Sequence, residues 1–104
     1  MTPDGPRQRN VAVFADGQVD RSPCGSGTSA RVALLADDGT LKPGQVLVHE
    51  SIVSTRFLAQ VVENVTAEGR DAVISEIRSM AYRTGEHTFV LDAEDPVGTG
   101  FVLR

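Results

Sequence analysis

The chain consists of short apolar runs between polar turns, with one longer apolar stretch near the middle of its first half. Residues 10–15 (NVAVFA) are β-branched or aromatic in character and lead into an Asp-Gly pair, which predicts a strand followed by a turn. Residues 24–37 carry apolar positions on nearly every helical face and end at Asp-Asp-Gly. This second pattern predicts a helix that is buried at the centre of a domain.

The rest of the chain favours strands. Short runs rich in β-branched residues are separated by Gly- and Pro-containing turns and cover residues 45–53, 56–65, 71–77 and 87–91. A closing apolar segment after two glycines predicts an edge strand, and the polar residues 1–9 predict a flexible lead-in. Together these patterns predict an α/β (α+β) fold in which several strands surround one apolar helix.

Composition narrows the class of protein. At 104 residues the chain has room for one domain, and its net charge of −4 without a basic cluster argues against a nucleic-acid partner. It lacks an apolar run of membrane-spanning length and a signal peptide, so we expect a cytoplasmic protein with no membrane partner. One cysteine excludes an internal disulfide, and its distance from His49 and His87 gives no metal-site spacing.

That single cysteine, Cys24, stands in the run DRSPCGSGTSA (residues 20–30) at the predicted start of the helix. Backbone N–H groups at a helix N-terminus stabilise a thiolate, which is the nucleophilic and basic form of cysteine. Cys24 is therefore a candidate reactive thiol. The alternative is a buried cysteine that packs as a small hydrophobic residue, and position alone does not decide between the two.

The glycines after Cys24 admit several interpretations. Residues 25–30 fit the loose form GxGxxA, but a dinucleotide-binding loop follows its strand directly within a βαβ unit, and here eight residues intervene. A P-loop requires a lysine after the last glycine, and Thr28 stands there. The glycines also suit a tight strand-to-helix connection. In either case the N–H groups of Gly25, Ser26 and Gly27 would form a site for a small anion such as a carboxylate.

Other polar and aromatic residues have a structural and a functional interpretation. Asp20 either lines the same pocket as Cys24 or is a solvated loop carboxylate. Phe14 ends an apolar strand and is typical of a core residue, and both histidines suit structural or surface positions better than a base role. A cysteine–histidine hydrolase would need a local signature around Cys24, and none is present.

Residues 10–31 (NVAVFADGQVDRSPCGSGTSAR) closely resemble the second cysteine motif of the proline racemase family, which includes hydroxyproline 2-epimerases and trans-3-hydroxyproline dehydratases. Residues 49–57, 81–85 and 87–104 look like the final segments of the same family. The resemblance implies that residues 10–104 are the C-terminal half-domain of such an enzyme. The N-terminal half, with a first cysteine motif of the form MCGHG, is then a missing partner.

The chain departs from the family pattern at three positions. Ser54 and Ser79 stand where the resemblance leads us to expect glycine, so the turns around them are expected to differ. Ser26 replaces the usual threonine after the Cys-Gly pair, a mild change if its backbone N–H does the binding.

The resemblance implies half of a diaminopimelate-epimerase-like fold, a curled and mostly antiparallel sheet around a central apolar helix. It further implies that Cys24 is one of two acid/base thiols, that Asp20 binds the substrate ammonium, and that the N–H groups of Gly25 and Ser26 bind its carboxylate. Phe14 would line the pocket. The resemblance also implies that no metal or organic cofactor is required, and members of the family are often homodimers.

Dehydratases of the family look to carry threonine at the position of Cys24, so the resemblance favours racemisation or epimerisation. It leaves proline and 4-hydroxyproline both open as substrates. The competing hypothesis is a non-catalytic, truncated fragment that keeps the half-domain fold and at most binds a small carboxylate.

Overall fold

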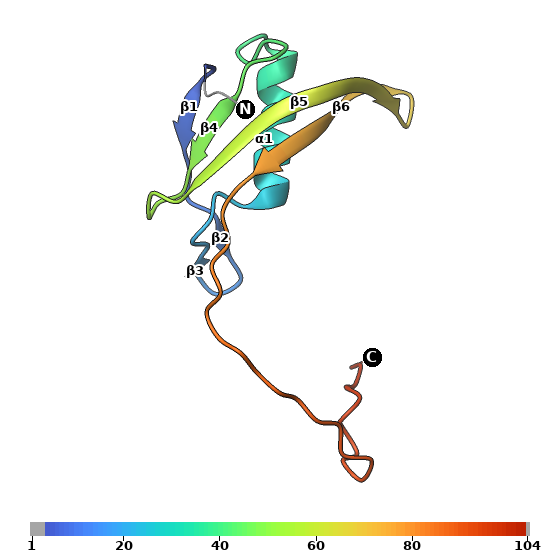
Figure 1. The fold of residues 1–104 in the computed structure, drawn as a ribbon. Helices are drawn as coiled ribbons and strands as arrows, with labels where there is room; N and C mark the ends of the chain where they lie inside the picture. Colours follow the sequence, from blue (N-terminus) through green and yellow to red (C-terminus); the bar gives the residue numbers. More distant parts are fainter. Residues whose placement is uncertain (1–3, 104) are drawn as a thin grey trace.

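The computed structural model describes residues 4–103 and contains one helix and two sheets (Figure 1). In chain order the elements are β1 (Arg7–Arg9), β2 (Val13–Phe14), β3 (Gln18–Val19), α1 (Gly25–Asp37), β4 (Leu47–Glu50), β5 (Arg56–Ala67) and β6 (Arg70–Arg78). The predicted mixture of helix and strands, the α+β class, is confirmed. Within the described range no helix has the length and apolar character needed to cross a bilayer.

The larger sheet has the strand order β1-β4-β5-β6. All four residues of β4 are buried, because this strand is paired on both sides. β1 pairs with β4 in parallel, and β5 pairs with β4 in the antiparallel sense. The predicted flexible lead-in is therefore wrong at residues 7–9, which form an edge strand. Their polar sequence gave no local signal, because β1 depends on a partner about 40 residues away.

The long β5–β6 hairpin agrees with the prediction to within two residues at every strand end. Its two-residue loop, Glu68 and Gly69, has φ values of 51° and 75°. Positive φ at both central positions is the type I′ turn that matches the twist of a hairpin. A register shift between Val61 and Glu63 marks a bulge in β5. Such a bulge increases the local twist of the hairpin.

Helix α1 lies against β5 and β6 and packs one face on the sheet. Its buried residues, Thr28, Val32 and Leu35, follow the spacing of a single helical stripe. Leu34, on another face, is 60% exposed. The prediction of a helix buried at the centre of the domain is thus wrong for the described part of the chain, where only one side is covered.

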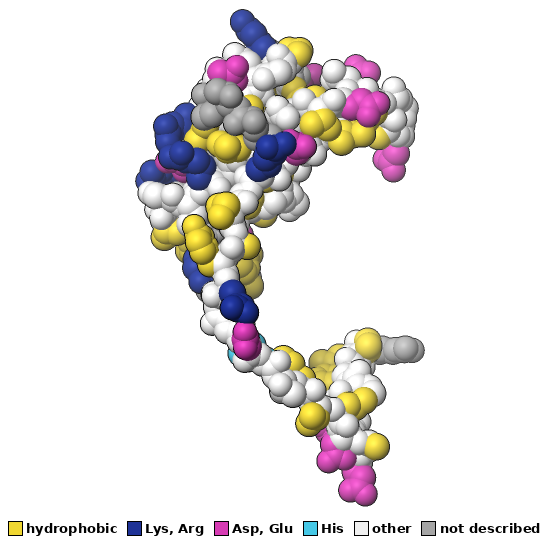
Figure 2. All heavy atoms as spheres, in the orientation of Figure 1, with side chains coloured by type: hydrophobic (Ala, Val, Ile, Leu, Met, Phe, Trp, Pro, Cys, Tyr) yellow, Lys and Arg dark blue, Asp and Glu magenta, His cyan; other side chains and the backbone are white. Residues whose placement is uncertain are grey.

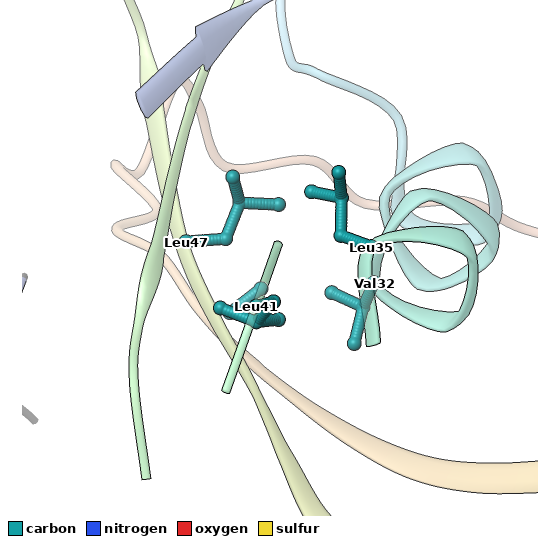
Figure 3. Packing of buried hydrophobic residues seen from close by; sticks show 5 residues of the cluster. Val32, Leu35, Leu41 and Leu47 are labelled. Atoms are coloured by element: carbon teal, nitrogen blue, oxygen red, sulfur yellow. The ribbon is translucent and has the colours of Figure 1, made fainter. Parts of the chain in front are cut away.

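The hydrophobic core lies between α1 and the sheet. Val32 and Leu35 from the helix meet Leu47 from β4 and Leu41 from the connecting loop (Figure 3). Ala59 of β5 completes the cluster and is fully buried. A hydrogen bond of 2.9 Å from the Leu41 N–H to the Leu35 carbonyl turns the loop back onto the helix, which places the Leu41 side chain in the core.

Strands β2 and β3 form a separate short hairpin next to the start of α1. The predicted strand at residues 10–15 is reduced to Val13–Phe14, because the chain turns at Ala15, whose φ is 48°, and at Gly17, whose φ is 90°. The hairpin's apolar side chains are half exposed, with Phe14 at 51%. Two-stranded ribbons of this size bury little apolar surface by themselves.

Residues 79–103 form neither helix nor strand, so the strand predicted at 87–91 and the closing edge strand are both wrong. This segment extends away from the body (Figure 1), and hydrophobic side chains lie on its surface (Figure 2). Phe89 is 89% exposed and Val90 is 90% exposed. The radius of gyration is 18.6 Å, whereas a compact domain of this length has a value of about 13 Å. The strand-like pattern needs a partner strand to become a strand, and the segment has none in this structure.

Candidate active site around Cys24

Cys24 is the N-cap residue of α1, as predicted from its position in the sequence. Its backbone has φ 71° and ψ 128°, which is an unusual conformation for a residue other than glycine. The Cys24 N–H donates to the Ser22 Oγ at 3.1 Å, and the Cys24 carbonyl accepts from the Thr28 N–H at 2.9 Å. Both sides of the residue are therefore held by hydrogen bonds, and the side chain stands at the positive end of the helix.

The surroundings of the thiol favour its ionised form. The Gly27 N–H and then the Ser26 hydroxyl, whose oxygen is 3.7 Å from the Cys24 Sγ, lower the pKa of the thiol. Burial and the negative charge of Asp20 act in the opposite direction and raise it. The net pKa lies below its ordinary value, and the thiol is only partly buried. A partly exposed thiol with a lowered pKa is the condition for reactivity as a base or nucleophile.

The predicted anion donors belong to the exposed first turn of α1. Gly25 and Ser26 are both exposed, and the first N–H groups of a helix lack acceptors within it. Apart from its chain neighbours and the backbone of the helix, a Cβ atom built on Gly25 would meet no atom within 4 Å, so the side-chain position of this residue faces open space. The turn is therefore accessible to a small anion. Its role in binding a carboxylate stays a prediction.

Asp20 belongs to the same loop as Cys24. Its Oδ1 accepts the Ser22 N–H at 2.8 Å, and its own N–H donates to the Ala12 carbonyl at 2.9 Å, which extends the β2–β3 hairpin. The carboxylate is half-buried, and its charge reaches the thiol of Cys24. Phe14 lies on β2 in the same hairpin. Its contact with the site stays a prediction.

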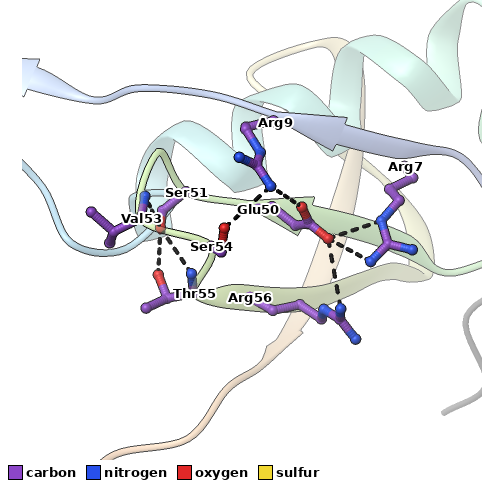
Figure 4. Close-up of polar contacts among 8 residues, drawn as sticks. All are labelled: Arg7, Arg9, Glu50, Ser51, Val53, Ser54, Thr55 and Arg56. Atoms are coloured by element: carbon purple, nitrogen blue, oxygen red, sulfur yellow. Dashed lines mark hydrogen bonds and ion pairs between the residues drawn. The ribbon is translucent and has the colours of Figure 1, made fainter.

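A turn between β4 and β5 supports the loop in front of Cys24. The Ser51 Oγ accepts from the Thr55 N–H at 3.1 Å and lies 2.6 Å from the Thr55 Oγ1 (Figure 4). The Thr55 hydroxyl in turn donates to the Arg21 carbonyl. Ser54 in this turn has φ 67°, in the left-handed region that favours glycine. The departure from glycine at Ser54 therefore falls at a position where the backbone favours glycine.

The neighbouring strands are joined by an ion cluster around Glu50. Arg7 Nε lies 2.8 Å and Arg9 Nη2 2.9 Å from the Glu50 carboxylate, and Arg56 Nη2 is 3.6 Å away (Figure 4). Hydrogen bonds from Arg9 and then Arg7 lower the pKa of Glu50 to about 2. The cluster connects β1, β4 and β5 and so explains how a short polar edge strand is held in place.

Sequence reasoning missed three residues that hold the loop. The Asn10 amide donates to the Pro23 carbonyl at 2.7 Å, and the Thr28 Oγ1 lies 2.8 Å from the His49 Nδ1. His49 is only 2% exposed, which confirms the structural interpretation of this histidine. Burial, and then the positive charge of Arg31, lowers its pKa. The available signal was the period of two along the strand, which puts His49 on the same face as the core residue Leu47.

The chain is similar to known proteins of one family. Residues 1–102 match the family model described as proline racemase. The chain is 48% identical over 96 residues to a proline racemase of Clostridioides difficile, which covers 92% of the chain and 29% of that protein. It is 44% identical over 104 residues to the 4-hydroxyproline 2-epimerase of Paracoccus denitrificans, covering 99% of the chain and 31% of the relative.

A trans-3-hydroxy-L-proline dehydratase of Bacillus thuringiensis is 45% identical over 95 residues, 91% of the chain and 28% of that protein. Among solved structures, a hydroxyproline epimerase from Agrobacterium vitis with bound trans-4-OH-L-proline superposes with a TM-score of 0.74 at 42% identity, over 91% of this chain and 27% of that one. The chain thus spans less than a third of the length of these relatives. The extent of these matches shows that the chain belongs to the proline racemase family.

Proposed function

We propose that this chain supplies one face of the active site of an amino-acid racemase or epimerase that inverts the α-carbon of proline or 4-hydroxyproline. The observation that carries the proposal is the Cys24 thiol at the start of α1, with the Gly27 N–H and the Ser26 hydroxyl lowering its pKa. Family membership supports the reaction type, because the relatives include proline racemases and hydroxyproline epimerases.

The chemistry requires two acid/base groups on opposite sides of the substrate. The Cys24 thiolate takes the α-proton from one face, and its electron pair forms the new S–H bond with that proton. The electrons of the broken C–H bond stay on the α-carbon, and a thiol on the other face returns a proton there and becomes a thiolate. Cys24 is the only cysteine in these 104 residues. The second thiol therefore comes from a part of the enzyme outside them.

The other predicted site residues have roles in binding. Asp20, whose Oδ1 is oriented by the Ser22 N–H at 2.8 Å, would pair with the substrate ammonium. The N–H groups of the exposed residues Gly25 and Ser26 would bind the carboxylate, and Phe14 would line the pocket. Fixed donors and charges around the α-carbon stabilise the negative charge that develops as the proton leaves. This is the electrostatic contribution that the chain would make to catalysis.

The cysteine favours isomerisation over dehydration. The resemblance implies that dehydratases carry threonine at the position of Cys24, and a threonine hydroxyl is too weak an acid to return a proton in this way. Isomerisation is therefore the function that we assign.

A chimera tests the proposal. The matching segment of the Clostridioides difficile proline racemase is replaced by this chain, which is 48% identical to it over 96 residues. We expect the chimera to invert the α-carbon of L-proline or 4-hydroxyproline, which polarimetry would detect as a change in optical rotation. In D2O the first product should carry deuterium at the α-carbon while recovered substrate keeps its proton, because different groups act on the two faces.

The matched control is Cys24→Ser in the same chimera, which should abolish inversion and keep the fold. The isolated chain is the second control and should show no turnover. An inactive but folded chimera that binds neither amino acid would refute the proposal. A Cys24→Ser chimera with full activity would refute the role of the thiol.

A further inference from the structure

A buried hydrogen-bond network connects β4 to the carbonyl group of Pro23, which directly precedes Cys24. Thr28 is fully buried and His49 is 2% exposed, and their side chains meet at 2.8 Å between Oγ1 and Nδ1. The Thr28 Oγ1 also lies 3.5 Å from the Pro23 carbonyl, which accepts the Asn10 amide at 2.7 Å as well. Buried polar groups destabilise the fold unless they are paired, so losing one member of this network would leave its partner unpaired at a cost in stability.

The single hydrogen of the Thr28 hydroxyl decides which group donates in each hydrogen bond of this network. A threonine hydroxyl has a single hydrogen to donate. Both contacts of Thr28 are made only if His49 donates from Nδ1 and the hydroxyl donates to the carbonyl of Pro23. We propose that His49 is a positioning residue, which acts through Thr28 and the Pro23 carbonyl to hold Cys24 in its reactive geometry. The inference rests on the role proposed above for Cys24.

The backbone of Cys24 explains why such support is needed. A φ of 71° with a ψ of 128° is unfavourable for a residue with a Cβ atom and persists only where the surroundings enforce it. The Ser22 Oγ and the Thr28 N–H bind the two backbone groups of Cys24. The buried hydrogen-bond network binds the carbonyl of Pro23, the residue before Cys24. Without that last support, the backbone can relax to negative φ, which would move the Sγ away from the Gly27 N–H.

A pair of Thr28 variants separates positioning from general stability. Thr28→Val keeps the shape of the side chain and removes the hydroxyl, whereas Thr28→Ser keeps the hydroxyl. The rate of Cys24 alkylation by iodoacetamide is followed against pH in the 104-residue chain, with circular dichroism to check folding. For Thr28→Val we expect a higher midpoint and a rate at pH 7 that falls about threefold, because the gain in nucleophilicity offsets part of the lost thiolate. Thr28→Ser should behave like the unmodified chain.

Nitrogen-15 NMR of the unmodified chain gives an independent readout that does not depend on a variant folding. His49 should be neutral at pH 7.5, because burial and the charge of Arg31 lower its pKa, and it should carry its proton on Nδ1. A proton on Nε2 would overturn the proposal, and so would a folded Thr28→Val variant with the alkylation profile of the unmodified chain. Neither measurement needs turnover. A folded chimera that is inactive and binds neither amino acid, found together with a shifted Thr28→Val profile in the 104-residue chain, would therefore refute the isomerase function and leave the positioning role of His49 standing.

Discussion

Replacing Ser54 by glycine should stabilise the fold, whereas the same replacement at Ser79 should not. Both serines stand where family resemblance leads one to expect glycine, but only Ser54 has a positive φ, at 67°. A left-handed conformation costs a residue with a Cβ atom about 1–2 kcal/mol. Glycine avoids this cost but loses about 0.5–1 kcal/mol more in chain entropy on folding.

The balance of these terms predicts a net stabilisation of about 0.5 kcal/mol for Ser54→Gly. The lost hydrogen bond from Arg9 Nη2 to the Ser54 Oγ is long, at 3.3 Å, and exposed, so its contribution is small. At Ser79 only the entropy term and a 3.4 Å contact with the Arg56 carbonyl are lost. Ser79→Gly should therefore leave stability unchanged or lower it by up to about 1 kcal/mol.

The assay is thermal unfolding followed by circular dichroism, together with urea titration at constant pH. For a domain of this size a gain of about 0.5 kcal/mol raises the Tm by about 2–4 °C. Equal destabilisation by Ser54→Gly and Ser79→Gly would refute the reasoning, because it would mean that the left-handed backbone at Ser54 carries no cost.

Three further predictions follow from local geometry and charge. Glu68→Asn in the type I′ turn between β5 and β6 should stabilise the chain by roughly 0.5 kcal/mol, since asparagine tolerates positive φ, and a urea midpoint that falls would contradict this. Because the pKa of Glu50 falls from 4.5 to about 2 on folding, its stabilising contribution is present above pH 4.5 and is lost as pH falls through 2. The urea midpoints of the unmodified chain and Glu50→Gln should accordingly differ most above pH 5 and converge towards pH 2, and a constant difference would argue against the ion cluster. At the thiol, Asp20→Asn should lower the pKa of Cys24 further and Ser26→Ala should raise it, as measured by alkylation against pH. Only the effect of Asp20 should shrink in 1 M salt, because it acts through charge at the protein surface.

Local patterns predicted the elements whose stabilising contacts lie close together in the sequence. The helix at residues 24–37 differs from the observed α1 by one residue, because its start and stop signals lie within the segment itself. The β5–β6 hairpin could be predicted from the sequence equally well, because its paired strands are joined by a two-residue turn. The motif around Cys24 placed the thiol at the helix start for the same reason.

Only the tertiary structure decided which segments found partners. β1 is a strand because β4 pairs with it and because Glu50 binds its two arginines, and neither condition is visible in residues 7–9 alone. Residues 87–91 have a strand-like sequence pattern but pair with no strand in the described structure, and they form no regular secondary structure. The contact between His49 and Thr28 likewise depends on α1 crossing the sheet at one particular place. Backbone hydrogen bonds within a helix or hairpin are specified by neighbouring residues, whereas pairing between distant segments depends on how the whole chain packs.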